Sequence, residues 1–311
     1  MTTRHRLFRR IASEALSHFP IEVTRLRLLH DGYNVTCEVR GRDQGGAVRR
    51  FALRVSRPEL TAHRVASEVA WCEALARDTD VRVLRIVRTR ADAPMVEVEG
   101  RCCVLSTWVA GAQRHKSLSP AMIEAVGAVS ARMHQHGQQW QPPTDFDRPV
   151  FDTVWLGSPS PLPALADDIA LSFAEAEQRL LPLLRRLVAE RCHIVHADLH
   201  QWNYRIAKGH DVGVIDFDDC ALASPTQDVA ISFYYLRRHP GHRALWDAFR
   251  RGYERVAPWP LDDPTRDALL VWRAMGLCAS VMTHENPRLR ALGAKLLPTY
   301  TQQVRDWLAC G

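Results

Sequence analysis

The sequence predicts an α+β protein in two parts, a small antiparallel sheet near the N-terminus and a larger, mainly helical part behind it. Short apolar segments separated by turn residues fill residues 26–55, a pattern typical of paired strands. After residue 119, apolar residues recur mostly at helical spacing. A chain of 311 residues is at the upper limit for one hydrophobic core. We therefore expect two lobes, residues 1–106 and 107–311.

The first residues predict an amphipathic helix that ends at Pro20. Its apolar face comprises Leu7, Phe8, Ile11, Ala12, Ala15, Leu16 and Phe19. Arginines are interspersed, so the segment resembles a transit peptide or a membrane-surface helix. Because no apolar run is long enough for a signal peptide or a span, we expect the helix to dock on the first lobe.

Three strands are predicted at residues 26–29, 36–40 and 51–55, with turns at 31–34 and 41–46. This is the strand order expected for the sheet of a small N-terminal lobe. A further apolar strand is predicted at residues 102–108.

Arg54 is a lone cation within the third strand, and Glu68 lies on a helix predicted at residues 61–77. Glu68 falls at the edge of an apolar stripe that includes Val65 and Val69. A carboxylate there is costly to bury without a partner. We expect Arg54 to be that partner; the alternative is a solvated Glu68 with Arg54 on an exposed strand face.

The second lobe is predicted from helix signals. Ser119, Pro120 and Gly137 supply a cap, a first-turn proline and a terminal glycine for one helix. Further helices are predicted at residues 168–190, 226–238, 243–256, 264–284 and 287–308. Between them, residues 141–166 are rich in proline and aromatic residues, which excludes a continuous helix and predicts an ordered, irregular wrap.

The chemistry is concentrated in residues 194–203 (I-V-H-A-D-L-H-Q-W-N) and 212–219 (V-G-V-I-D-F-D-D). Residues 204–207 and 212–215 predict a hairpin in which Asn203 and Asp216 are equally far from the turn. In the simplest antiparallel register these two residues face each other. An amide oxygen beside a carboxylate suits Mg²⁺, and Asp198 would stand close enough to accept a hydroxyl proton.

The H-x-D-x-x-x-x-N and I-D-F-D patterns resemble those of the aminoglycoside phosphotransferase and choline kinase family, small-molecule relatives of the protein kinases. The resemblance implies a two-lobed protein-kinase-like fold and transfer of the γ-phosphate of ATP to a small-molecule hydroxyl. By that resemblance Asp198 is the catalytic base, His196 braces its loop, and Asn203 and Asp216 bind Mg²⁺. Asp218 matches a second acidic position with a variable metal role, and Asp228 matches a carboxylate that anchors the catalytic loop.

The resemblance also implies a nucleotide site in the first lobe. Its residues would be Arg54, Glu68, Gly32, Asn34, Ser106 and Trp108. Arg54 would orient phosphates, the turn with Gly32 would cover them, and the backbone of Ser106 and Trp108 would bind adenine. The turn lacks G-x-G-x-x-G, so an ordinary hairpin turn is its alternative interpretation. Trp108 could equally be plain core, and Arg54 stands where the wider superfamily mostly has Lys.

Three rival functions are open. A zinc hydrolase would use His193, His196 and His200. A Ser/Thr protein kinase similar to bacterial stress-response kinases would share the Asp-x-Asp-Asp ending. A nucleotide-binding pseudokinase is suggested only by Arg54. No A-P-E-like segment follows Asp216, which favours a small-molecule acceptor over a peptide. We expect residues 141–166 to help enclose that acceptor; a purely structural crossover is the alternative.

The composition limits the classes of binding partner and the cellular location that we expect. The net charge of +6 comes from dispersed basic residues without a concentrated basic run, so we expect neither nucleic acid nor membrane as a partner. From Ala221 onward there are 12 Lys and Arg against 8 Asp and Glu, unlike the acidic surface that a polycationic aminoglycoside requires. The 8 cysteines form no disulfide framework, so a reducing cytoplasm is the simplest location. Adjacent Cys102 and Cys103 must point to opposite faces of their strand.

Overall fold

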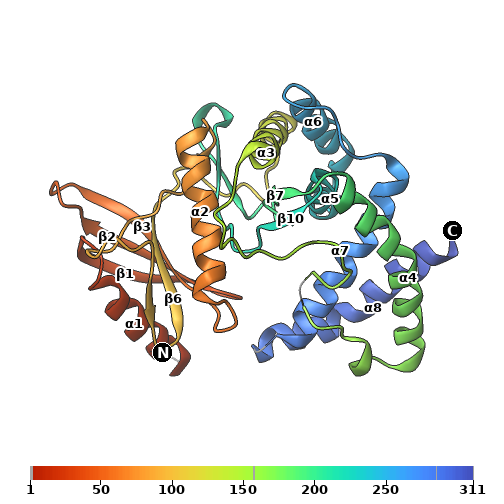
Figure 1. Cartoon of the computed structure of the whole chain (residues 1–311), viewed down its shortest axis with the longest axis horizontal. Helices are drawn as coiled ribbons and strands as arrows, with labels where there is room; N and C mark the ends of the chain where they lie inside the picture. Colours follow the sequence, from red (N-terminus) through yellow and green to blue (C-terminus); the bar gives the residue numbers. More distant parts are fainter. Residues whose placement is uncertain (1–2, 157, 285, 311) are drawn as a thin grey trace. The chain divides into compact units, whose positions relative to one another are not determined.

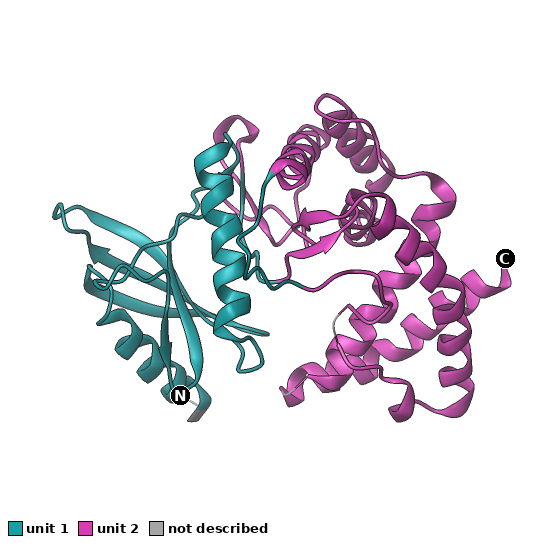
Figure 2. Ribbon diagram, viewed as in Figure 1, with its two compact units in different colours: residues 1–111, 140–148, 213–218 teal, residues 112–139, 149–212, 219–311 magenta. Residues whose placement is uncertain are grey.

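The computed structural model describes residues 3–156, 158–284 and 286–310, and the chain divides into two compact units (Figure 2). Unit 1 comprises residues 1–111, 140–148 and 213–218. Unit 2 comprises residues 112–139, 149–212 and 219–311. Unit 1 thus extends past the expected boundary at residues 106–107 and includes two segments from later in the chain.

Unit 1 is built on an antiparallel sheet with the strand order β1-β2-β3-β6-β5. Strands β1, β2, β3 and β6 are labelled in Figure 1. The strands are β1 (Glu22–Asp31), β2 (Val35–Arg42), β3 (Val48–Val55), β5 (Val96–Val98) and β6 (Arg101–Thr107). The predicted strands are confirmed; β1, β2 and β3 begin earlier than expected, and β6 is shifted by one residue from the predicted range of 102–108. Arg54 on β3 lies between Thr36 on β2 and Val104 on β6.

The predicted N-terminal helix, α1 (Thr3–Leu16), packs on one face of this sheet (Figure 1). Its buried residues Phe8 and Ile11 share a core with Phe51 and Leu53 of β3. Apolar residues alternate along the strand because neighbouring side chains point to opposite faces. The expected docking of α1 on the first lobe is confirmed.

Helix α2 (Ala62–Asp78) is part of a second core of unit 1, on the other face of β6. Val65 and Val69 pack there with Cys102, whereas Cys103 belongs to the core that includes α1. The opposite orientation expected for the two cysteines is confirmed. Strand β4 (Arg82–Val83) pairs in parallel with Gly213 and Val214 of β9 (Val212–Val214).

Unit 2 is mainly helical, as expected. Its longer helices are α3 (Pro120–Gln139), α4 (Asp167–Glu190), α5 (Pro225–Leu236), α6 (His242–Glu254), α7 (Asp263–Thr283) and α8 (Pro287–Ala309). Helix α3 packs on α6, and α7 packs on both α5 and α8. Within residues 3–156, 158–284 and 286–310, no helix is long and apolar enough to cross a membrane.

Gly137 does not end its helix, contrary to expectation. Helix α3 continues through Gly137 to Gln139. A Cβ atom on Gly137 would lie 2.2 Å from the carbonyl oxygen of Ile194 in β7 (His193–Val195). The glycine therefore allows the helix to approach the strand that leads into residues 196–203.

Short strands frame the functional segment of unit 2. Strand β7 pairs with β10 (Ala221–Ala223), and β8 (Tyr204–Ile206) follows the H-x-D-x-x-x-x-N motif. The amide of Ala207 donates to the carbonyl of Asp211 at 2.8 Å across the predicted turn. Gly209 in this turn has φ +75°, a left-handed conformation that glycine adopts without strain.

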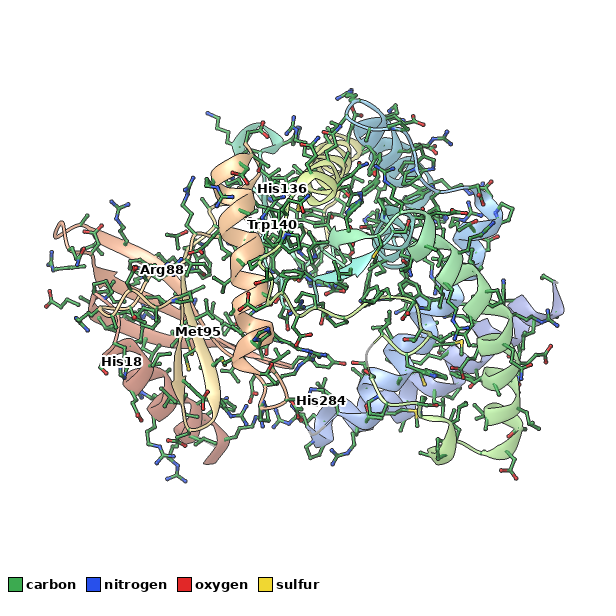
Figure 3. All side chains as sticks on the ribbon, viewed as in Figure 1. His18, Arg88, Met95, His136, Trp140 and His284 are labelled. Atoms are coloured by element: carbon green, nitrogen blue, oxygen red, sulfur yellow. The ribbon has the colours of Figure 1, made fainter. Side chains whose placement is uncertain are left out.

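Residues 141–156 and 158–166 are largely irregular, as predicted, but they belong to different units. In unit 1, Trp140, which is labelled in Figure 3, packs edge-on against Phe146, with ring centroids 5.3 Å apart. In unit 2, buried Phe151 contacts Trp272 of α7, and buried Trp155 donates a hydrogen bond to Glu177 of α4. These contacts place both rings in the interior of unit 2; the lining of an acceptor pocket stays a prediction.

Candidate active site

The loop after β7 is held from within unit 2 by buried Asp228. Asp228 lies in the first turn of α5, whose start is fixed by the capping box of Ser224 and by Pro225. Its Oδ1 accepts a hydrogen bond from the Ala197 amide at 2.6 Å, and its Oδ2 lies 2.8 Å from His134 Nε2. The contact expected between Asp228 and the loop that carries Asp198 is present.

His196 is buried inside the same loop. Its Nδ1 accepts a hydrogen bond from the Asp198 amide at 3.3 Å. Ala197 has φ +63°, a conformation uncommon for residues with a side chain. The bonds on both sides of Ala197 stabilise this conformation, which turns the chain sharply just before Asp198.

The Asp198 carboxylate contacts three nitrogen atoms of unit 2. Oδ1 lies 2.5 Å from Arg273 Nη2. Oδ2 accepts from Asn203 Nδ2 at 2.7 Å and lies 3.1 Å from His200 Nε2. The Trp202 amide donates to His200 Nδ1 at 3.3 Å, so Nδ1 is the unprotonated ring nitrogen and Nε2 carries the proton that points at Asp198.

These neighbours keep Asp198 ionised. Burial alone raises the pKa of the Asp198 carboxyl, but interaction with His200 and then with Arg273 holds that pKa below its usual range. Burial alone lowers the pKa of the Arg273 guanidinium, whereas Tyr235 and Asp198 raise it above its usual range. The pair is therefore a carboxylate and a cation at neutral pH.

Asn203 is oriented by its own loop. Nδ2 donates both to the carbonyl of Asp198 at 2.9 Å and to its carboxylate. With the nitrogen side of the amide committed, the Oδ1 side points away from Asp198. The arrangement presents a neutral oxygen of the kind that binds hard cations.

In unit 1, the predicted ion pair of Arg54 and Glu68 is present. Nη1 and Nη2 of Arg54 donate to Oε1 and Oε2 of Glu68, both at 2.6 Å. Both side chains are largely buried, with 14% and 5% exposed. Burial alone lowers the pKa of Arg54, but attraction to Glu68 and the hydrogen bonds raise it above its usual range. The fork geometry ties β3 to α2.

The acidic segment after β9 lies in the same unit. Asp216 is exposed and has φ +68°. Buried Asp218 accepts from Asn34 Nδ2 at 2.5 Å, while Asn34 Oδ1 accepts from the Arg57 amide at 3.0 Å. Burial raises the pKa of Asp218, but Arg54 and interaction with Asp216 lower it below its usual range overall. Unit 1 therefore gathers two carboxylates beside one buried guanidinium.

The remaining predicted nucleotide contacts are also in unit 1. The Gly32 amide donates to the carbonyl of Asn34 at 3.1 Å within the β1–β2 turn. Ser106 Oγ donates to the carbonyl of Ala52 at 3.4 Å. The Trp108 amide donates to the carbonyl of Arg50, and the Arg50 guanidinium carbon lies 3.5 Å from the Trp108 ring centroid. Binding of a nucleotide by these groups stays a prediction.

The structure thus gathers the predicted residues into two sets. Unit 1 holds Gly32, Asn34, Arg54, Glu68, Ser106, Trp108, Asp216 and Asp218, and unit 2 holds His196, Asp198, Asn203 and Asp228. Asn203 and Asp216 belong to different units, and their predicted pairing stays a prediction. Among the described residues, no group of three or more His, Cys, Asp or Glu side chains is placed to hold a metal ion. The zinc site of three histidines is not supported.

Comparison with known proteins settles the family. Residues 25–270 match the model of the phosphotransferase enzyme family, known as APH. The chain belongs to this family. An uncharacterized protein of Deinococcus radiodurans is 28% identical to this phosphotransferase over 251 residues, covering 75% of this chain and 69% of that protein.

Solved structures show the fold. Amicoumacin kinase hAmiN, in complex with AMP-PNP, Ca²⁺ and Ami, matches with a TM-score of 0.79 at 18% identity, over 98% of this chain and 96% of that one. A microcompartment-associated aminopropanol kinase matches with a TM-score of 0.74 at 22% identity, over 97% and 98% of the two chains. The expected protein-kinase-like α+β fold is confirmed for this phosphotransferase.

Two arginines of the phosphotransferase were missed by sequence reasoning. Arg273 of α7 binds Asp198, as described above. In unit 1, buried Arg148 donates to the backbone carbonyls of Asp218 and of Arg64 in α2. It thereby links the acidic segment to the helix that carries Glu68. A single arginine beside Pro149 gives no signal of such a contact, whereas Arg273 is detectable as a lone charge within an apolar helix.

Proposed function

We propose that this phosphotransferase moves the γ-phosphoryl group of ATP to a hydroxyl group of a small molecule in a Mg²⁺-dependent reaction. The observation that carries the proposal is the Asp198–Asn203 hydrogen bond of 2.7 Å inside the H-x-D-x-x-x-x-N loop, within the residues that match the family. That loop joins an ionised carboxylate to an amide oxygen free to bind a cation, the two groups needed on the acceptor side of phosphoryl transfer.

The relatives support the class of reaction. One is named a kinase of amicoumacin and holds AMP-PNP with Ca²⁺, and another is named an aminopropanol kinase. Both names describe phosphorylation of small molecules, which favours this reaction over protein phosphorylation. A nucleotide and a divalent cation follow for this chain at the level of the family, and ATP and Mg²⁺ are our specific proposal.

The residues present suit Mg²⁺. Asn203 offers Oδ1, exposed Asp216 offers a carboxylate, and Asp218 is the secondary candidate because Asn34 already occupies its Oδ2. Mg²⁺ needs only one or two such protein oxygens, since phosphate and water complete its shell. When bound, Mg²⁺ neutralises phosphate oxygens and fixes their orientation.

Other residues would bind and orient the reactants. Arg54 holds Glu68 with its two terminal nitrogens, and its buried Nε has no hydrogen-bond partner among the described residues. A phosphate oxygen would satisfy this donor. Asp198 would accept the hydrogen bond of the acceptor hydroxyl and take its proton as the bond from that oxygen to the γ-phosphorus forms. The bond between the γ-phosphorus and the bridging oxygen of ATP would break at the same time and release ADP, while His196 and Asp228 hold the loop.

The metal assignment is tested with nucleotide binding. Mg²⁺ should tighten binding of AMP-PNP to the wild type, and Asp216→Ala should abolish that tightening because it removes a charged ligand. Asp211→Ala, an exposed aspartate in the preceding turn, is the matched control and should behave like the wild type. Isothermal titration with and without Mg²⁺ gives the answer. Equal Mg²⁺ coupling in the Asp216 variant would refute the assignment.

The acceptor class is tested by ATP consumption. The wild type should consume ATP with hydroxylated metabolites or natural products and not with a Ser/Thr protein substrate. Each positive compound should yield a phosphorylated product by mass spectrometry, and Asp198→Asn should remove it. Transfer to protein alone would replace the proposal by the protein-kinase interpretation.

A further inference from the structure

Arg273 is an unusual residue for its position in α7. It is 5% exposed, and the residues on either side of it, Trp272 and Ala274, are buried and apolar. A buried guanidinium is strongly unfavourable unless it is paired. Its Nη2 donates to Asp198 Oδ1 at 2.5 Å and to Tyr235 Oη at 2.9 Å. The helix therefore delivers one fixed positive charge to the carboxylate of the catalytic loop.

The contacts that Asp198 makes with the described residues leave one lone-pair direction for an acceptor hydroxyl. A carboxylate offers about four lone-pair directions. Oδ2 uses two of them, for Asn203 Nδ2 and for the Nε2 proton of His200, and Oδ1 uses one for Arg273. The free direction is on Oδ1, the same oxygen that Arg273 binds. An acceptor hydroxyl on Asp198 therefore lies next to the guanidinium.

The guanidinium beside this position changes how strongly a charged group next to the reacting hydroxyl is attracted. A bare carboxylate attracts an ammonium group on the carbon beside the reacting hydroxyl. With Arg273 in contact, the attraction is cancelled by repulsion over a similar distance. A neutral neighbour is unaffected, and an anionic neighbour is attracted to the guanidinium and repelled by the carboxylate.

We propose that Arg273 is a specificity-determining residue, because of which the enzyme does not prefer hydroxyl groups that have an ammonium group on the adjacent carbon. The inference rests on the proposed function and deepens it by naming a substrate class. Asp198 alone would create a preference for amino alcohols, and Arg273 removes that preference.

Three compounds with one carbon skeleton test this inference. 1,2-Propanediol, lactate and 1-amino-2-propanol share a secondary hydroxyl and differ in the charge of its neighbour. Each is assayed as phosphoryl acceptor, and any that does not react is assayed as a competitor of an acceptor found by the ATP-consumption screen. The wild type should use or bind the diol at least as well as the amino alcohol. A clear preference for the amino alcohol would overturn the inference.

Variants of Arg273 supply a second, independent test. Arg273→Gln keeps hydrogen-bonding capacity and removes the charge, so the ratio of kcat/KM for amino alcohol over diol should rise about tenfold or more. Arg273→Lys keeps the charge and should leave the ratio within about threefold of the wild type. A purely structural role lowers activity toward both compounds and leaves their ratio unchanged. An unchanged ratio in the Arg273→Gln variant would therefore overturn the inference.

Controls separate the possible failures. Arg237→Met removes another arginine of unit 2, one that binds Gln303 and stacks on Tyr234, and should not change the ratio. Asp219 also attracts Arg273 and is kept in every variant.

If the Arg273→Gln variant does not fold, the preference of the wild type between the diol and the amino alcohol decides alone. If none of the three compounds reacts or competes while other acceptors are phosphorylated, this inference fails and the proposed function stands. If no small molecule is phosphorylated, the proposed function itself fails.

Discussion

Asp198 is the proposed catalytic base, and its surroundings predict the effect of replacing it. Asp198→Asn keeps the size of the side chain and removes its charge and its capacity to take a proton. We expect kcat to fall by about 10²-fold or more, the usual contribution of a positioned acid or base, while nucleotide affinity is retained. Initial rates and isothermal titration measure the two quantities. Near-normal turnover with lost nucleotide affinity would exchange the roles given to Asp198 and Asp216.

Individual contacts differ in how well the sequence predicts them. The pairing of Arg54 with Glu68 was predictable because both residues stand out, one as a lone cation in a strand and the other at the edge of an apolar stripe. Arg273 and Asp198 are 75 residues apart. The sequence shows that Arg273 needs a partner, but only the packing of α7 beside the catalytic loop identifies which one.

At the scale of elements, Gly137 shows how a helix is positioned against a strand. Alanine normally stabilises a helix relative to glycine by up to about 1 kcal/mol. At position 137 the added Cβ would meet the Ile194 carbonyl oxygen at 2.2 Å and His193 Nδ1 at 3.0 Å. We expect Gly137→Ala to lower the free energy of unfolding by about 1–3 kcal/mol, as for other overpacked sites. Urea denaturation measures the change.

Gln139→Ala is the control for this prediction, because Gln139 is an exposed residue of the same helix. It should change the free energy of unfolding by less than about 0.5 kcal/mol. A Gly137→Ala protein at least as stable as the wild type would mean that α3 can move away from β7 at no cost.

Helix starts were predictable where a cap and a proline stand together. Asn286 and Pro287 begin α8, and Asp262 caps α7, as their sequences indicate. The end of α3 was predicted wrongly because Gly137 serves close packing with β7. The sequence does not distinguish a glycine that ends a helix from a glycine that allows close packing. The contact that distinguishes these two roles involves a residue far along the chain.

At the scale of the whole molecule, buried His193 makes stability depend on pH. Burial lowers the pKa of its imidazole from 6.5 to about 4. As pH falls below 6.5 the unfolded chain takes up this proton first, so the free energy of unfolding falls between pH 6.5 and pH 4. From about pH 7.5 to about pH 5 the loss from His193 is about 2 kcal/mol.

Urea denaturation of the wild type and of His193→Gln at both pH values isolates this contribution, because the other histidines are common to both proteins. The His193→Gln variant should lose less stability on acidification by the stated amount. Equal losses in the two proteins would show that His193 becomes protonated in the folded state at its ordinary pKa.

The two-part organisation and the class of the longer elements followed from the sequence, but the short strands β4, β5, β7 and β10 and the membership of residues 140–148 and 213–218 in unit 1 did not. That membership depends on contacts such as the Asp147 amide with Ser67 Oγ and Arg148 with the carbonyl of Asp218. These bonds join residues 80 and 70 positions apart. Local patterns of hydrophobicity carry no information about them.

The discontinuity of unit 1 also sets the order in which the protein can be completed during translation. Residues 1–111 leave the ribosome first, but the last piece of unit 1, residues 213–218, follows roughly a hundred residues later. Until then Asn34 has no Asp218 to bind. Unit 1 therefore stays incomplete while much of the helical unit is synthesised. A gene fragment that stops at Gly111 would encode a lobe without its acidic segment.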